Sequence, residues 1–346
     1  MSDISNELYD CRTAIPGKTY NLYDLAKWKN GLAFKKIDFS DSGIPVIKIA
    51  ELNSGIGPTT AYTKGTYSEE VHLFRGDMVF SWSGNPQTSI DVFWFPLDEG
   101  WLNQHIFKVT PYENIVLKEY LYYLMKSLKP VFTTIASNKQ TTGLGHVTIS
   151  DLKELKVTIP DLEMQRRIVE LIKPFDDKIN KNNEIEDNLL EQSKVLYKAW
   201  FIDFELFDGE MPSDWHDGTV EEIIELHDSK RKPLSGRERE MMDKIYPYYG
   251  ATSIMDYVDD YIFDGVYLLL GEDGSVINLE GYPILQYVFG KFWPNNHAHI
   301  ITGKNGYSVE MLYLLFSMTN VQNIVTGAVQ LKISQQNLKK VEAVIP

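Results

Sequence analysis

The chain carries one ordered series of segments twice, and this duplication constrains its architecture more than any single motif does. The first series is Trp101–Val109, Leu117–Ser127 and Thr142–Pro160, and the second is Trp293–Ile301, Ser308–Met318 and Thr326–Pro346. The later segments lie 184 to 192 residues downstream and keep the same order. Solenoid repeats have periods of about 20 to 50 residues, so this period is too long for one. The sequence therefore predicts two copies of one whole domain.

The stretch between the copies, Leu162–Trp200, has the spacing of a helix. Steps of three or four residues give Ile168, Ile172, Phe175, Ile179, Asn182, Glu186, Leu189, Ser193, Leu196 and Trp200. Seven of these ten are apolar, which predicts a long packed helix of roughly 60 Å at about 1.5 Å per residue. Pro174 is expected to kink or divide it. The predicted organisation is a domain at 1–160, a helical segment at 161–205 and a second domain at 206–346.

Composition limits the class of protein. The chain has 346 residues, 43% of them apolar and 12% aromatic, which is enough for two cores and argues against disorder. The lone cysteine, Cys11, excludes an internal disulfide framework and indicates a reducing compartment. No apolar run approaches the roughly 20 residues of a membrane span, and the polar N-terminus resembles neither a signal nor a transit peptide. We therefore expect a cytoplasmic protein without membrane contact.

The charge is unfavourable for a free-standing DNA-binding protein. The net charge is −14, and Lys+Arg against Asp+Glu number 16 and 17 in residues 1–160, 7 and 11 in 161–205, and 11 and 20 in 206–346. None of these parts is a basic domain, although DNA-binding proteins usually present a basic footprint. DNA binding would need local basic patches, or partners that supply phosphate contacts.

Both copies are expected to be mixed α/β domains. The first copy has strand patterns, helices and a polar loop at Ile44–Leu52, Gly76–Gly84 (turn, strand, turn), Asp91–Phe95, Ile106–Thr110, Leu117–Ser127 (helix, ended by Lys129-Pro130), Ser137–Gly143 (loop), Ile149–Leu155 (short helix) and Lys156–Ile159. In the second copy, Tyr246–Ser253 and Gly265–Gly274 take the places of Ile44–Leu52 and Gly76–Gly84, and Asp228–Glu240 is an inserted charged loop. Gln330 and Lys332 occupy the turn equivalent to Gly145–Val147.

This pattern resembles the specificity (S) subunit of Type I restriction–modification systems. The residues that carry the resemblance are Gly76–Val79, Gly265–Gly271, Asn103–His105, Asn295–His297, the two segments ending at Pro160 and Pro346, and Met211–Trp215. The run Ile159–Ile168 is similar to the family's "IPP-LEEQ--I" entry into its conserved helix, with Asp161 for the second Pro and Met164 for the second Glu. The resemblance covers essentially the whole chain.

The resemblance implies two target-recognition domains, each reading one half of a bipartite site in double-stranded DNA. The helix would set the gap between the half-sites and dock two modification (methyltransferase) subunits. It also implies that the chain is not an enzyme and binds no cofactor itself, because S-adenosylmethionine, ATP and Mg belong to the methyltransferase and restriction subunits. The family's distal second helix has no counterpart before Pro346. A second S chain or fragment supplying that helix is therefore one expected partner, and a shortened, regulatory S chain is one alternative.

Polar and basic loop residues are the candidates for DNA contact. Arg and Lys read guanine, Asn and Gln read adenine, and Ser and Thr adapt to several bases. The candidates in the first copy are Lys35, Lys36, Ser81, Trp82, Ser83, Asn85, Gln87, Thr88, Asn138, Lys139, Gln140 and Thr141. Those in the second copy are Lys230, Arg231, Lys232, Arg237, Arg239, Gln330 and Lys332. Arg231 and Lys232 are predicted phosphate contacts, and Gln140 a base contact. Trp82 could equally belong to the core, and the basic cluster could be a loop with internal Arg–Glu pairs.

Candidate partner-docking residues on the helix are Ile168, Ile172, Phe175, Ile179, Leu189 and Leu196, which we expect to combine core packing with partner docking. Catalytic and metal motifs are not recognisable. Asn85-Pro86-Gln87-Thr88 lacks the second Pro and the aromatic residue of an adenine-methyltransferase loop, and no Walker motif occurs. His297 and His299 alternate as on a strand, so one ring should face inward and the other outward. A scaffold that binds protein or glycan remains the main alternative function.

Overall fold

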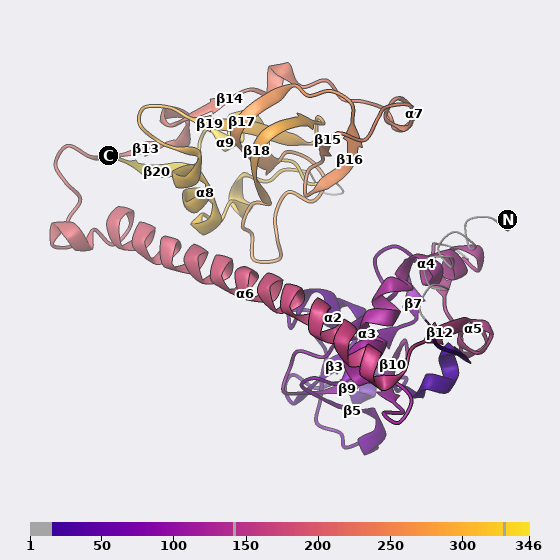
Figure 1. Cartoon of the computed structure of the whole chain (residues 1–346). Coiled ribbons are helices and arrows are strands. Elements are labelled where there is room, and N and C mark those ends of the chain that lie inside the picture. Colours follow the sequence, from indigo (N-terminus) through magenta and orange to yellow (C-terminus); the bar gives the residue numbers. More distant parts are fainter. Residues whose placement is uncertain (1–15, 141–142, 328–329) are drawn as a thin grey trace. The chain divides into compact units, whose positions relative to one another are not determined.

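The structure is a computed structural model that describes residues 16–140, 143–327 and 330–346 (Figure 1). It divides into two compact units, residues 1–181 and 182–346, each taken by itself below. Within the described ranges, no helix combines the length and apolar character that crossing a lipid bilayer requires.

The first unit contains two four-stranded sheets with helices packed on one of them. Its elements are β1 (Lys18–Asn21), β2 (Ala26–Asn30), β3 (Ile44–Ile47), α2 (Ile49–Ser54), β4 (Tyr62–Thr63), β5 (His72–Phe74), β6 (Met78–Ser81), β7 (Ser83–Gly84), β8 (Asp91–Trp94), β9 (Glu99–Leu102), β10 (Ile106–Pro111), α3 (Lys118–Ser127), α4 (Lys129–Asn138), β11 (Gly145–His146), α5 (Ile149–Glu154) and β12 (Lys156–Ile159). The antiparallel sheet has the order β2-β10-β6-β8 and the mixed sheet β4-β3-β9-β5. Helices α3 and α4 bury Leu121, Met125 and Phe132 against the antiparallel sheet.

The second unit repeats this plan around one six-stranded sheet. Its elements are β13 (His216–Thr219), β14 (Ile224–Leu226), α7 (Gly236–Glu240), β15 (Tyr246–Tyr249), β16 (Ile254–Val258), β17 (Phe263–Gly271), β18 (Leu285–Pro294), β19 (Ala298–Gly303), α8 (Val309–Met318), α9 (Gln335–Leu338) and β20 (Glu342–Ile345). The sheet order is β14-β19-β17-β18-β15-β16. Helix α8 packs Leu312, Leu315 and Phe316 into the main core of this unit.

Strand pairing confirms the duplication. The order β2-β10-β6-β8 of the first unit returns as β14-β19-β17-β18 in the second, in both cases antiparallel throughout. The parallel pairing of Val46 with Trp101 returns as the parallel pairing of Tyr248 with Trp293. Corresponding positions of the two repeats can therefore be matched residue by residue through their backbone partners.

Helix α6 (Leu162–Phe201) is one helix of 40 residues, with Pro174 inside it. The expectation that Pro174 divides the helix is wrong. A proline removes one helical N–H and leaves the carbonyl four residues earlier without its donor. Residues 170–175 are exposed, so water can satisfy that carbonyl.

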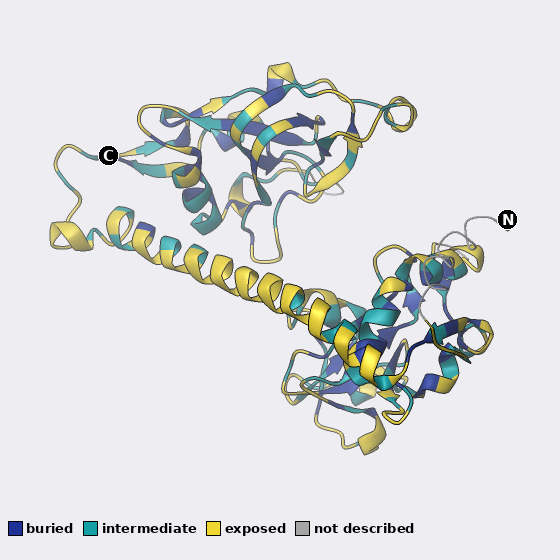
Figure 2. Ribbon diagram, viewed as in Figure 1, coloured by how far each residue is buried: buried dark blue, intermediate teal, exposed yellow. Residues whose placement is uncertain are grey.

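Each end of α6 is anchored in the unit to which it belongs. The buried Gln165 accepts a hydrogen bond from Leu117 N at 2.8 Å and donates to the carbonyls of Ile115 and Pro160. This bond caps α3, whereas α8 is capped by its own Ser308. Near the other end, the buried Tyr197 joins the main core of the second unit, and Phe201 stacks on Trp215. The middle of α6 is exposed (Figure 2).

Three local expectations need correction. Ile44–Leu52 is only half a strand, because α2 begins at Ile49 with Glu51 bonded back to Lys48 N at 3.0 Å. A second helix, α4, follows α3 where Lys129-Pro130 was expected to end the helical segment. The polar loop is also shorter than predicted, since its first two residues, Ser137 and Asn138, complete α4.

Candidate nucleic-acid interface

The candidate loops of the first unit come together where the turn between β6 and β7 is hydrogen-bonded to two other segments, a crossing of three backbone segments. Strand β6 ends at Ser81, and the short strand β7 then pairs with β11, so that Ser83 faces His146. Trp82 N donates to His105 O at 3.2 Å, and Val147 N donates to Trp82 O at 2.8 Å. These bonds hold together Trp82, Ser83, His105 and His146, which we call the first junction.

Trp82 lies between the two alternatives that its sequence left open, a core residue and an exposed DNA-contact residue. Its indole N–H donates to Asn30 Oδ1 at 3.0 Å, and its ring stacks on Phe107 at 5.6 Å between centroids. The rings of His105 and His146 lie 5.7 and 5.9 Å away on the same tryptophan. Trp82 is therefore a half-buried platform that supports two histidines.

The polar groups of the first junction differ in accessibility. Ser83 is buried and its hydroxyl contacts His146 Nδ1 at 2.9 Å. Ser81 is fully buried, so its assignment as a DNA contact is wrong, and its hydroxyl has no partner among the described residues. Burial, and next the charge of His146, lower the pKa of His105, so this exposed ring is neutral near pH 7.

The loop after β7 presents three exposed polar side chains. Asn85, Gln87 and Thr88 are all exposed. Asn85 Oδ1 accepts from the backbone N–H of Gln87 at 2.9 Å and of Thr88 at 3.3 Å, which fixes the turn. The side chains of Gln87 and Thr88 therefore stand on a locally ordered backbone, as a base-reading loop requires.

The loop after α4 is tied at its first residue. Asn138 and Gln140 are exposed, whereas Lys139 forms an ion pair with Asp151 at 2.5 Å. Burial alone would raise the pKa of Asp151, but hydrogen bonds from Lys139 and Thr148 and the charge of Lys139 bring it below its usual value. The side chain of Lys139 is thus engaged in an ion pair that ties this loop to α5. Thr141 lies outside the described residues, while Lys35 and Lys36 are exposed beside Asp38.

The second unit has a matching crossing. Glu272 N donates to His297 O and Ile333 N donates to Glu272 O, both at 2.8 Å. The positions that correspond to the first junction are therefore Glu272, Asp273, His297 and Lys332, which we call the second junction. The predicted match between the turn of Lys332 and that of Gly145–Val147 is confirmed. His299 is fully buried and His297 is partly exposed, as their alternation predicted.

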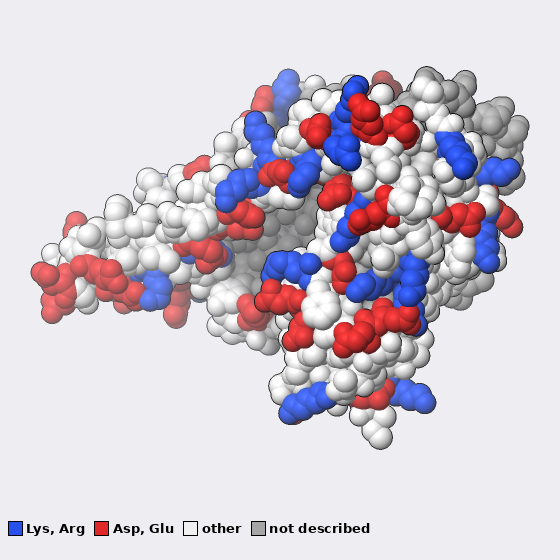
Figure 3. All heavy atoms as spheres, turned by 60° about the horizontal axis from the view of Figure 1, so that its bottom comes forward, with Lys and Arg blue, Asp and Glu red and all other residues white. Residues whose placement is uncertain are grey.

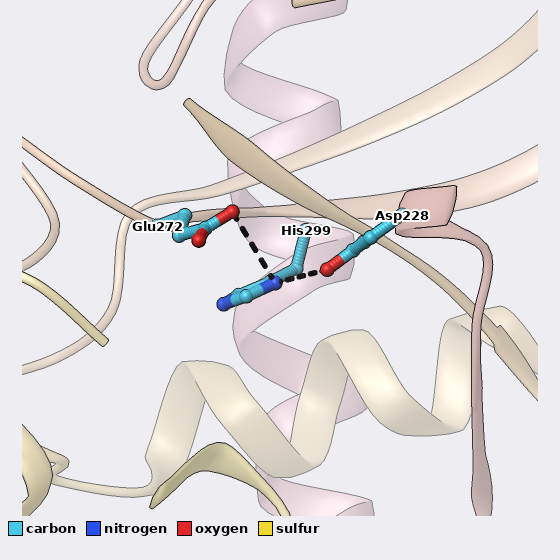
Figure 4. Close-up of side chains that lie close together, drawn as sticks. All are labelled: Asp228, Glu272 and His299. Atoms are coloured by element: carbon cyan, nitrogen blue, oxygen red, sulfur yellow. Dashed lines mark hydrogen bonds and ion pairs between the residues drawn. The ribbon is translucent and has the colours of Figure 1, made fainter. Parts of the chain in front are cut away.

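Beneath the second junction lies a charged network that sequence reasoning missed. Asp228, Glu272 and His299 converge there from three segments of the unit (Figure 4). By register they stand where the first unit has Asn30, Trp82 and Phe107, because Asn30 faces Phe107 as Asp228 faces His299 and Ile300. An aromatic stack in one repeat is therefore replaced by an ionic cluster in the other.

Arg231 supplies the positive charge of this network and contacts both of its carboxylates. Its guanidinium lies 2.6 Å from Glu272 Oε2 and 3.5 Å from Asp228 Oδ2, and it donates to the carbonyl of Ala298 at 2.7 Å. Its side chain is only 14% exposed. The prediction that Arg231 contacts DNA phosphate is therefore wrong, because its guanidinium is ion-paired with buried carboxylates of its own unit.

The carboxyl groups of the network are satisfied. Burial would raise the pKa of Asp228, but hydrogen bonds from His299, Ile300 N and Gln335 bring it below its usual value. His299 lies between two acceptors, Asp228 Oδ2 at 2.6 Å and Ile333 O at 2.8 Å. One ligand atom each from Asp228, Glu272 and His299 would lie within 4.8 Å of the others, a spacing that a metal ion could use. Arg231 already supplies the countercharge, so the geometry favours a structural ion-pair network.

The remaining basic residues of the inserted loop divide into two kinds. Arg239 is internal, with its guanidinium 4.8 Å from the centre of the Tyr248 ring and 3.5 Å from Asp256. Lys230, Lys232 and Arg237 are exposed, and their side chains have no partner among the described residues. The alternative of internal pairs thus holds for Arg231 and Arg239. At the junction itself, Lys332 lies 3.2 Å from Glu272.

Acidic and basic side chains are interspersed on the surface. On the face drawn in Figure 3, they lie close together and no broad basic area is visible. The candidate phosphate contacts are therefore single exposed cations, which agrees with the absence of a basic domain in the sequence.

Five of the six candidate docking residues on α6 are exposed: Ile172, Phe175, Ile179, Leu189 and Leu196. Phe175 is 71% and Ile179 56% exposed. Ile168 instead is partly buried and packs against the core of the first unit. The stripe therefore divides between the two expected roles: core packing at Ile168, and an exposed apolar face from Ile172 to Trp200.

Comparisons with known proteins identify the family. The model of the Type I restriction modification DNA specificity domain matches residues 16–191 and again 212–346. The chain therefore belongs to this family, and it contains the domain twice.

Relatives and a solved structure agree with this assignment. The Type I restriction enzyme HindI specificity subunit of Haemophilus influenzae is 36% identical over 99 residues, covering 28% of this chain and 21% of that protein. The MjaVIII specificity subunit of Methanocaldococcus jannaschii is 26% identical over 194 residues, covering 54% and 43%. The chain thus spans less than half the length of the curated relatives it matches. The crystal structure of a Type-I restriction-modification S subunit from M. genitalium shares the fold, with a TM-score of 0.50 and 16% identity over 95% of this chain and 84% of that one.

Proposed function

We propose that this chain is the DNA sequence-specificity subunit of a Type I restriction–modification complex, and that each repeat reads one half of a bipartite site. The observation that carries the proposal is the pair of junctions. The same backbone crossing presents polar side chains in both repeats, but the side chains differ. A duplicated scaffold with diverged polar loops suits the reading of two different half-sites.

The family to which the chain belongs supports this division of labour. Because the domain that the chain contains twice is a DNA specificity domain, we assign this chain recognition and no catalytic step. S-adenosylmethionine, ATP and Mg would be bound by methyltransferase and restriction subunits. We place the complex in the cytoplasm, where it meets DNA.

The exposed apolar face of α6 is the proposed docking surface for two methyltransferase subunits. Phe175 and Ile179 lie one turn apart on this face and contribute large apolar surfaces to it. Burying such side chains in an interface contributes about 25 cal/mol per Å² of apolar area. A second S chain or fragment is the other occupant considered, and the mass of the purified complex distinguishes the two.

Long-read methylation sequencing tests the proposal. DNA would be taken from cells that express this chain together with a Type I methyltransferase subunit from the same source, and from cells that express the methyltransferase subunit without this chain. We expect methyl-adenine confined to a bipartite motif, present only when this chain is expressed. If the methyltransferase is soluble and bound to this chain but methylates nothing, the chain acts as a regulatory subunit. If the two proteins do not associate, a scaffold function replaces the proposal.

A further inference from the structure

The two junctions place different hydrogen-bonding groups at corresponding positions. Position 83 of the first repeat corresponds to position 273 of the second, because the residues before them make the same two backbone bonds. The first repeat has the neutral Ser83, bonded to His146. The second has Asp273, in close contact with His297 Nδ1. A carboxylate thus replaces a hydroxyl at one point of a shared scaffold.

The contact between Asp273 and His297 fixes the direction of the remaining hydrogen-bonding atoms. A carboxylate accepts only, so Nδ1 of His297 donates to Asp273 Oδ1. Gln330 Nε2 lies 3.5 Å from the same oxygen. Neither Asp273 Oδ2 nor His297 Nε2 has a partner among the described residues. Asp273 Oδ2 is therefore a free acceptor of the dyad, and Nε2 of His297 is a second acceptor whenever the ring carries only the Nδ1 proton.

This acceptor pair is reachable from solvent and held in place from below. The His297 side chain is 44% exposed and that of Asp273 is 19% exposed. His297 N donates to Asn295 Oδ1 at 2.7 Å, and Asp273 forms a backbone bridge with Lys332. The neighbouring Glu272 is neutralised by Arg231 and Lys332. Within the described part of the unit, Asp273 is therefore the carboxylate of the second junction that has no Lys or Arg side chain as an ion-pair partner.

We propose that the Asp273–His297 dyad is the specificity-determining element of the second repeat, and that it selects a base presenting an amino group in the major groove, cytosine or adenine. The inference rests on the proposed function and adds the chemistry of one recognised base. Cytosine N4 and adenine N6 donate to acceptors, whereas guanine O6 and thymine O4 are acceptors themselves. Facing these oxygens, the dyad would leave a desolvated carboxylate without a donor, so it rejects those bases.

The test compares Asp273→Asn with Asp259→Asn. Asp259 is exposed and lies outside the junction, so the second variant makes the same charge change elsewhere. Each variant is assembled with the methyltransferase subunit, and its methylated motif is sequenced. Binding is then measured on oligonucleotides with all four bases at each position of both half-sites. An Asn side chain can donate as well as accept.

For Asp273→Asn we expect discrimination against guanine and thymine to fall by about 10- to 100-fold at one position of one half-site. The other half-site should be read as before, and Asp259→Asn should change no preference. An unchanged motif in Asp273→Asn overturns the inference. So does a uniform loss of affinity with preserved base preference and a lower melting temperature, which would mark Asp273 as purely structural. If the wild-type complex yields no motif at all, the proposed function itself fails.

Discussion

Replacing Arg231 by methionine tests whether the basic cluster of the inserted loop is structural or phosphate-binding. Methionine keeps much of the aliphatic volume and removes the guanidinium. The change deletes contacts to Glu272 at 2.6 Å and Asp228 at 3.5 Å, together with the hydrogen bonds to the carbonyls of Asp228, Asn296 and Ala298. Asp228 and Glu272 would remain with side chains only 3% and 13% exposed.

The structure sets the size of the effect. Breaking a buried ion pair by removing one partner costs about 3 to 5 kcal/mol, because the other charge stays buried without compensation. Lys332 still lies 3.2 Å from Glu272, and His299 still bonds to Asp228, so we expect the lower end, about 3 kcal/mol. A unit of this size shifts its melting temperature by roughly 2 to 4 °C per kcal/mol, so about 6 to 12 °C is expected.

Differential scanning calorimetry of the full chain measures this shift, with Lys232→Met as the matched control. Lys232 is exposed one residue away and has no side-chain partner among the described residues, so its replacement should change stability by less than about 0.5 kcal/mol. Our reasoning is refuted if Arg231→Met melts within about 1 °C of wild type. It is also refuted if both variants weaken DNA binding to the same degree without loss of stability.

Four further outcomes are expected. Lys232→Ala should weaken binding to all DNA sequences alike and reduce the slope of log K against log salt by about 1, and an unchanged slope would remove Lys232 from the phosphate contacts. Gln140→Ala should alter base preference in one half-site only, and an untouched motif and affinity would end that loop assignment. Phe175→Asp should block association with the methyltransferase in a pull-down while the chain melts as before, since this side chain is 71% exposed; normal association would exclude this part of α6. The pKa of Asp228 in the folded chain is below its ordinary value of 3.8, so the ionised carboxylate contributes its full share to the free energy of unfolding above about pH 4. This contribution is lost as the pH falls through the pKa of the folded state. Urea unfolding from pH 6 to 3 measures the loss, and a flat profile would contradict it.

The duplication made the larger part of the fold predictable from sequence. Segments aligned between the copies proved to be corresponding strands and helices, such as β6 with β17 and α3 with α8. Local breaks were harder to place. Pro130 was taken to end a helix, yet it occupies the first turn of α4, where a missing N–H costs nothing. The start of α2 had a usable signal in Glu51, three residues after Lys48, because that spacing is typical of a capping box.

The candidate site was less predictable because its chemistry depends on residues far apart in sequence. In the sequence, Lys230, Arg231 and Lys232 are three adjacent basic residues with nothing to distinguish them. In the structure, Arg231 donates hydrogen bonds to Glu272 and Ala298, which lie more than 40 residues away in the chain. Ser81 and Ser83 likewise resemble surface residues in the sequence, but Ser81 is buried between β10 and β8, and Ser83 is buried where β7 pairs with β11. The alternation of His297 and His299 did predict that one ring is buried and the other is not, and the structure buries His299. Local periodicity therefore placed side chains inside or outside, but it could not pair charges across the sheet.

The internal ion pairs of Arg231 and Arg239 reduce the number of cations available for DNA phosphate in an already acidic chain. In residues 206–346 there are 20 acidic side chains and 11 basic ones, and at least five of the basic ones, Arg231, Arg239, Lys244, Lys332 and Lys339, form ion pairs with carboxylates of the same unit. If the proposed function holds, Lys230, Lys232 and Arg237 supply few phosphate contacts, and partner subunits are expected to contribute much of the salt-dependent affinity. Under that condition a carboxylate such as Asp273 is tolerable at the DNA surface. It would add little affinity, yet it would reject bases that present oxygen, which is the property that the proposed function requires.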